Sequence, residues 1–208
     1  MFKIKTLTQL IKVSMVLNRK LILWLAIGLG LLFILTANTG PTLAPLYWIA
    51  LFAGGILISS SAFKELHETG NRIHYLTLPC SSFSRYLSVW LLTGPLYFIF
   101  ITSLYGVGVL AHVLSKNFWA FGDPLSVFWT GGQYLIANTL FLLGAVFFKK
   151  LPLIKTLFIL LLLYIAWVIL EGTLKINLSE SVQNGLALAL GLLAWHGAYF
   201  QLKKTELK

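Results

Sequence analysis

The sequence predicts an all-α polytopic membrane protein with six transmembrane helices and an amphipathic, interfacial helix at the N-terminus. Of the 208 residues, 58% are hydrophobic and only 11% are charged, whereas a soluble domain is about one quarter charged. The apolar residues also come in long runs, and about 20 such residues cross a bilayer as a helix. These runs leave room for six spans and short loops, and for no separate soluble domain.

The expected elements follow in chain order as a single transmembrane domain over 1–208. Residues 1–20 are basic and apolar at helical spacing, which suits a helix lying in the membrane interface. The six spans are expected at about 21–37, 46–62, 88–114, 127–148, 153–170 and 185–202. Pro95 falls inside the third span, where a kink or break is expected.

The basic residues predict the topology. With the N-terminus in the cytoplasm and six alternating spans, fourteen of the sixteen Lys and Arg residues lie on the cytoplasmic side. Only Lys116 and Lys175 lie on the other side. The positive-inside rule therefore predicts that both termini, the 63–87 loop and the 149–155 turn are cytoplasmic.

The spans contain few groups that carry chemistry. No G-x-x-x-x-G-K-[ST] phosphate loop occurs, so no ATP hydrolysis by this chain alone is expected, and no cofactor in it. The net charge of +10 is spread over span ends, which fits a membrane protein better than a nucleic-acid binder. Polar residues in the fourth span, Gln133, Asn138 and Thr139, either form interhelical hydrogen bonds or line a substrate path.

The 63–87 loop is the one long polar interruption. Its charged and histidine side chains are Lys64, Glu65, His67, Glu68, Arg72, His74 and Arg85. Such a loop cannot lie in hydrocarbon, where polar groups lack partners, so it is interpreted as a docking surface for a soluble partner. A metal site or protease site is disfavoured, because the spacing is not H-E-x-x-H. The single Cys80 excludes an internal disulfide and is interpreted as an ordinary thiol rather than a nucleophile.

Three short pieces of this loop carry a resemblance to a known family. They are Lys64-Glu65, the Tyr75–Ser81 segment YLTLPCS, and Tyr86-Leu87. The loop resembles the cytoplasmic segment between spans two and three of ABC-2 type transporter permeases. In that family the segment holds a coupling helix that docks on the nucleotide-binding subunit. The resemblance implies contacts to the ATPase from Lys64, Glu65, His67, Glu68, Arg72, Tyr75, Leu76, Leu78 and Pro79.

The same resemblance implies partners and a location. Two ABC ATPase subunits would bind ATP and Mg²⁺, and a second permease copy or a paralogue would complete the pathway in the lipid membrane. Export of a hydrophobic or amphipathic substrate across a bacterial inner membrane is the expectation. Two alternatives stay open: a non-transporting anchor or scaffold subunit, and a membrane-embedded enzyme.

Overall fold

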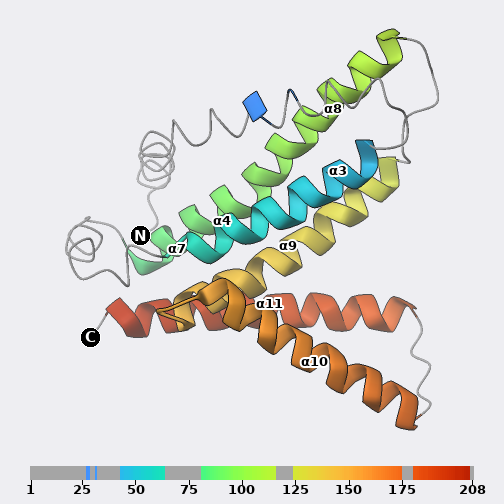
Figure 1. The fold of residues 1–208 in the computed structure, drawn as a ribbon. Coiled ribbons are helices and arrows are strands. Elements are labelled where there is room, and N and C mark those ends of the chain that lie inside the picture. Colours follow the sequence, from blue (N-terminus) through green and yellow to red (C-terminus); the bar gives the residue numbers. More distant parts are fainter. Residues whose placement is uncertain are drawn as a thin grey trace. The chain divides into compact units, whose positions relative to one another are not determined.

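The computed structural model describes residues 27, 28, 31, 43–63, 81–115, 124–174 and 180–206, and every secondary-structure element in them is helical (Figure 1). The all-α prediction is confirmed for this part of the chain. The predicted interfacial helix, 1–20, and nearly all of the predicted first span lie outside the described residues. The elements are α3 (Leu43–Ile49), η1 (Ala50–Gly54), α4 (Gly55–Ser61), α7 (Ser82–Leu91), η2 (Leu92–Leu96), α8 (Tyr97–Ser115), α9 (Pro124–Phe147), α10 (Pro152–Leu174) and α11 (Glu180–Glu206).

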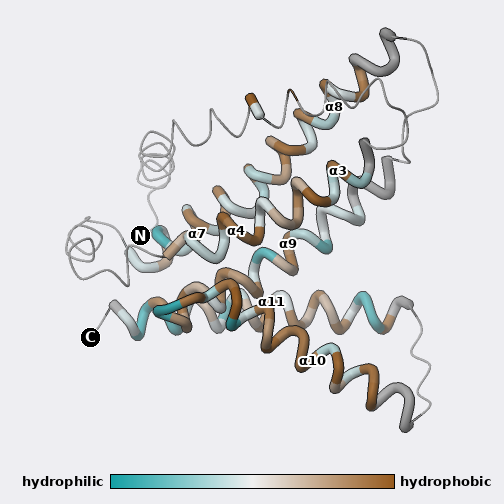
Figure 2. The backbone as a smooth tube through the Cα atoms, viewed as in Figure 1, coloured by the Kyte–Doolittle hydropathy of each residue, from teal (hydrophilic) through white to brown (hydrophobic). Residues whose placement is uncertain are grey.

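Four helices in the described residues are long and apolar enough to cross a membrane. Their apolar stretches are Ser82–Leu110, Trp129–Phe147, Pro152–Ile169 and Val182–Thr205. A further apolar helix, Pro45–Ser61, is shorter. Figure 2 shows hydrophobic residues distributed along these helices, most densely along α10. The chain is thus a helical membrane protein, and the six-span arrangement stays a prediction.

The helix ends have local causes. Pro124 and Pro152 are the first residues of α9 and α10, a position where the missing proline N–H costs no hydrogen bond. The last turn of α11 carries Lys203 and Lys204, whose charges favour the negative end of the helix dipole. Helix α7 begins at Ser82, so the last six residues of the expected 63–87 loop are helical.

The chain forms two compact units, which we call unit 1 and unit 2. Unit 1 comprises Met1–Gly55 and Phe83–Leu135, and unit 2 comprises Ile56–Ser82 and Ile136–Lys208. The described core of unit 1 contains the buried side chains of Tyr47, Leu51, Tyr86, Ile101 and Tyr134. That of unit 2 contains Phe63, Leu142, Val146, Ala198 and Leu202. The continuous helix 43–61 and helix α9 each contribute residues to both units.

Within unit 2, helices α9 and α11 pack in parallel. A Cβ placed on Gly191 would lie 3.3 Å from Cγ1 of Ile136, and one on Gly197 would lie 3.4 Å from Cδ1 of Leu143. In the two contacts the residue numbers differ by nearly the same amount, so the two helices run in the same direction. Glycine permits this close approach, as small residues commonly do between membrane helices.

Helix α10 is held differently. Its Thr156 packs on Gly144 of α9, where an added Cβ would lie 2.9 Å from the threonine Cβ. Among the α10 residues of described exposure, Thr156 alone is buried. The attachment of α10 within unit 2 therefore lies near the start of this helix.

Candidate functional site: a polar helix interface

Two apolar helices that contribute residues to unit 1 contain a π-helical segment in mid-helix. In 43–61 it is η1, and in 82–115 it is η2. Pro95 lies inside η2 and lacks the N–H of a normal helix residue. The expected kink or break at Pro95 is a widened turn through which the helix continues. The N–H of Tyr97 bonds to the carbonyl of Gly94, whereas an α-helix would direct it to Thr93.

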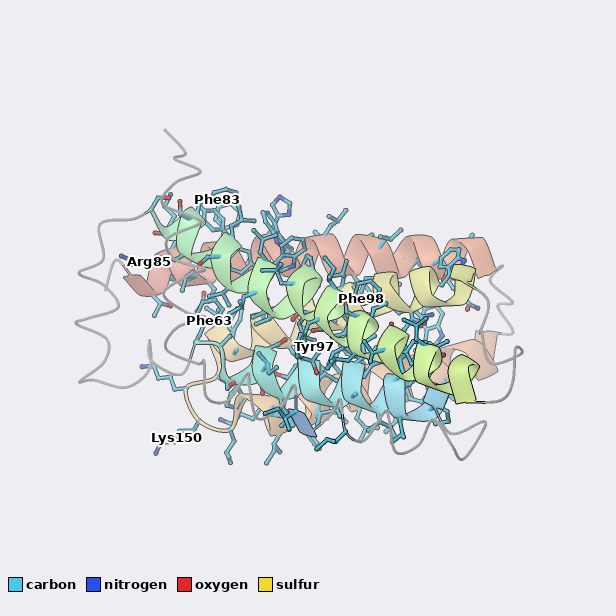
Figure 3. The ribbon with its side chains drawn as sticks, turned by 90° about the horizontal axis from the view of Figure 1, so that it is seen from above. Phe63, Phe83, Arg85, Tyr97, Phe98 and Lys150 are labelled. Carbon is cyan, nitrogen blue, oxygen red and sulfur yellow. The ribbon has the colours of Figure 1, made fainter. Side chains whose placement is uncertain are left out.

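Tyrosine hydroxyls from other helices bind the carbonyls of both π segments. The Tyr134 hydroxyl, from α9, donates to the carbonyl of Thr93 in η2. The Tyr97 hydroxyl, from α8, donates to the carbonyl of Ala50 in η1 at 2.7 Å. Figure 3 shows Tyr97 between α8 and the 43–61 helix. These bonds give the two carbonyls a side-chain donor from a neighbouring helix.

The rings of these tyrosines lie against two consecutive glycines. A Cβ on Gly54 would lie 3.4 Å from Cζ of Tyr97, and one on Gly55 would lie 2.7 Å from Cζ of Tyr134. The ring centroids of Tyr97 and Tyr134 are 5.9 Å apart, and the Phe52 ring meets Tyr134 edge-on at 6.0 Å. Only glycine leaves space for the tyrosines to cross the 43–61 helix here.

The polar interface extends along unit 1. The hydroxyl oxygens of Tyr47 and Thr102 are 3.2 Å apart, joining α3 to α8. The rings of Tyr47 and Tyr105 are 4.8 Å apart. We call Tyr47, Tyr97, Tyr105 and Tyr134 the tyrosine layer. It joins three helices by neutral hydrogen bonds and ring contacts, which suits a membrane interior where charges are costly.

A second polar contact lies inside unit 2. The Ser59 hydroxyl donates to Oδ1 of Asn138, and both side chains are fully buried. The Asn138 amide nitrogen is also buried and has no hydrogen-bond partner within the described residues. Thr139 is buried as well and donates to the carbonyl of Ile136 at 2.7 Å. This geometry supports the interhelical hydrogen-bonding alternative for Asn138.

The three residues proposed for a substrate path have different surroundings. Gln133 is exposed, whereas Asn138 and Thr139 are buried. Five residues of α-helix turn the side chain by about 140°, so Gln133 and Asn138 occupy different faces of α9. The structure therefore does not bring the three side chains together on one surface.

The predicted ATPase-contact residues, Lys64, Glu65, His67, Glu68, Arg72, Tyr75, Leu76, Leu78 and Pro79, lie outside the described residues, as do His74 and Cys80. Both ends of the loop are described. Phe63, at the first end, is 1% exposed within unit 2. Arg85 and Tyr86, close to the second end, are buried within unit 1. Ser88 donates to the carbonyl of Arg85 at 2.8 Å. The polar loop is therefore flanked by buried side chains on both sides.

The described residues contain no group of three or more His, Cys, Asp or Glu residues that could hold a metal ion. Nδ1 of His196 lies 2.9 Å from the carbonyl of Leu192 in the same helix turn, which is a local structural contact. Sequence reasoning missed the tyrosine layer. Its signal was the Gly54-Gly55 pair inside an apolar span, a pattern typical of close helix contact.

Comparison with known proteins yields no relative: no family model, no curated protein and no solved structure matches this chain. The class that the fold defines is a helical membrane protein.

Proposed function

We propose that the chain is the transmembrane permease subunit of an ATP-driven ABC transporter that exports a hydrophobic or amphipathic substrate. A separate pair of ATPase subunits would bind ATP and Mg²⁺ and dock on the 63–87 loop. A second permease copy or a paralogue would complete the pathway. The observation that carries this proposal is the polar loop with buried anchors near both of its ends, Phe63 at its start and Arg85-Tyr86 close to its end.

Buried anchors suit a coupling element. A force applied to a loop is transmitted to the neighbouring helix when the end of that helix is held by packing and does not bend. Phe63 lies two residues after the end of α4, and Arg85 and Tyr86 lie in the first turns of α7. In the proposed mechanism, closure of the ATPase shifts these helix ends as a rigid body. The tyrosine layer then keeps the 43–61 and 82–115 helices together during the movement.

The charge distribution favours ATP as the energy source. Ion-coupled transporters usually place ionisable residues in mid-membrane. In the described spans the Lys and Arg residues lie towards the helix ends, as Arg85, Lys155 and Lys203 do, and His196 is the one histidine inside a span. The chain also has no phosphate loop of its own. The energy for transport would then come from a partner on the cytoplasmic side.

The test is reconstitution in liposomes with the candidate ATPase. Glu65→Ala with His67→Ala, or Pro79→Gly alone, is expected to weaken co-purification or uncouple ATP hydrolysis from transport. Deletion of 206–208 is the control and should have little effect. Equal effects of loop variants and deletion would refute a dedicated coupling loop. Complex formation without transport or stimulated hydrolysis would indicate an anchor subunit instead.

Topology gives an independent check. In a Cys80→Ser background, a cysteine at Lys208 or Asn71 should resist a membrane-impermeant thiol reagent in intact cells. A cysteine at Asn177 should react. Strong labelling of the 63–87 loop from outside would overturn the proposed orientation and, with it, docking of a cytoplasmic ATPase.

A further inference from the structure

One end of unit 2 carries a group of five lysines, which we call the lysine cluster. Its members are Lys149, Lys150, Lys155, Lys203 and Lys204. All five side chains are exposed. Lys149 and Lys150 lie in the turn between α9 and α10, Lys155 lies in the first turn of α10, and the other two lie in the last turn of α11.

The packing of unit 2 gathers these three segments at one end. Helices α9 and α11 run in parallel through the Ile136–Gly191 and Leu143–Gly197 contacts. Extending the same offset places Lys149 level with Lys203. The Gly144–Thr156 contact then holds the start of α10 beside the end of α9. In Figure 3 the side chain of Lys150 points outward from the turn.

The cluster is cationic, with one ammonium group on each of its five members. Nζ of Lys155 lies 5.5 Å from the centroid of the Phe148 ring, a contact that leaves the ammonium hydrogens free for another acceptor. Five positive charges at three neighbouring helix ends attract a ligand with several negative charges.

Apolar side chains lie between the lysines. Phe147, Leu151, Ile154 and Phe200 are each more than half exposed. The apolar stretches of α9 and α10 also end and begin here, at Phe147 and Pro152. This mixture of basic and apolar groups is typical of the headgroup level of a bilayer. A water-soluble acidic protein would cover the lysines but would leave the apolar side chains facing water or an ill-suited surface.

The turn between α9 and α10 reverses the chain within a few residues. Leu151 has a φ of 52°, in the left-handed region that bulky residues rarely adopt. It precedes Pro152, which disfavours the right-handed helical conformation at Leu151. The N–H of Lys155 nevertheless bonds to the Leu151 carbonyl at 3.1 Å, so α10 starts at once. The short reversal keeps Lys149 and Lys150 within a few residues of both apolar stretches.

We infer that the lysine cluster is a binding site for the phosphate groups of anionic phospholipids, with Phe147, Leu151 and Phe200 inserted beside the acyl chains. This inference requires only that α9, α10 and α11 lie in a membrane. It is independent of the proposed transport activity, so failure of one does not imply failure of the other.

The experiment is native mass spectrometry of the purified full chain in mild detergent, titrated with phosphatidylglycerol or phosphatidylcholine. The wild-type chain should bind phosphatidylglycerol more tightly. A membrane-proximal lysine contributes about a fivefold change in affinity. Lys149→Gln with Lys150→Gln should therefore reduce the preference by about tenfold or more, and Lys203→Gln with Lys204→Gln should do the same. Replacement by arginine should retain the preference, and added salt should weaken it.

Lys116→Gln with Lys175→Gln is the charge-matched control and should leave lipid preference unchanged. Equal loss in this control would show that net charge, rather than the cluster, attracts the lipid, and would overturn the inference. Displacement of the lipid by millimolar inorganic phosphate, or by a polyglutamate peptide, would overturn it as well. So would glutamine variants that lower thermal stability but keep the lipid preference, because the lysines would then serve only the C-terminal helix dipoles.

Discussion

Replacing Gly55 by alanine should destabilise unit 1, because the space above Gly55 is filled by Tyr134. The added Cβ would lie 2.7 Å from Cζ of that ring and closer still to its edge. The ring cannot readily move away. Tyr134 is 0% exposed, its hydroxyl is bonded to Thr93, and its faces meet Phe52 and Tyr97. Overpacking of this kind costs about 1–3 kcal/mol.

Gly132→Ala is the matched control. Gly132 also lies in an apolar helix, but an added Cβ there would meet nothing within 4 Å. Alanine favours helix over glycine by about 0.5–1 kcal/mol at either site, so this gain cancels when the two variants are compared. The remaining difference, about 1–3 kcal/mol, is the steric term at Gly55.

The assay is the free energy of unfolding of the chain in bicelles, from circular dichroism during titration with sodium dodecyl sulfate. A double-mutant cycle with Tyr134→Leu, which removes the far edge of the ring, gives the direct coupling. We expect the two substitutions to be non-additive by about 1 kcal/mol or more. If Gly55→Ala were as stable as Gly132→Ala, or if the cycle were additive, the close packing of Tyr134 on Gly55 would be refuted.

Two further predictions concern stability. Ser59→Ala should cost about 0.5–1.7 kcal/mol in the same assay, because it removes the hydroxyl that donates to Asn138. Ser61→Ala should cost less, because Ser61 is exposed and donates to the carbonyl of Ile58 in its own helix. Leu151→Gly should be more stable than Leu151→Ala by about 1 kcal/mol, since glycine relieves the left-handed strain that alanine retains; equal stabilities would argue against a left-handed turn before Pro152.

Hydropathy predicted the described helices well, because an apolar run long enough to cross a bilayer has few other folds open to it. Helices α9 and α10 begin at Pro124 and Pro152, which lie outside the predicted fourth and fifth spans. The π segments left a weaker signal. Pro95 pointed to one disturbance in the third span, but the sequence of η1 contains no proline. The widened turn of η1 is apparent only in the structure, together with the tyrosine that packs across it.

The sequence pattern could not predict which polar residues of distant segments would pair. Ser59 and Asn138 are 79 residues apart, and nothing in either segment specifies the other. The helical repeat alone could have separated Gln133 from Asn138, because a spacing of five residues does not return to the same face. The predicted coupling residues of the 63–87 loop stay predictions, and only the loop's buried ends support them.

The attachment of α10 near its start has a consequence for its behaviour in a bilayer. The apolar stretch Pro152–Ile169 has 18 residues, which gives a length of about 27 Å, close to the hydrocarbon thickness of about 30 Å. Lipid chains solvate such a helix as well as another apolar helix would, so the described contacts alone provide little resistance to a swing about Thr156. Hydrophobic matching then determines the tilt. A thicker membrane should hold α10 upright, and a thinner one should incline it.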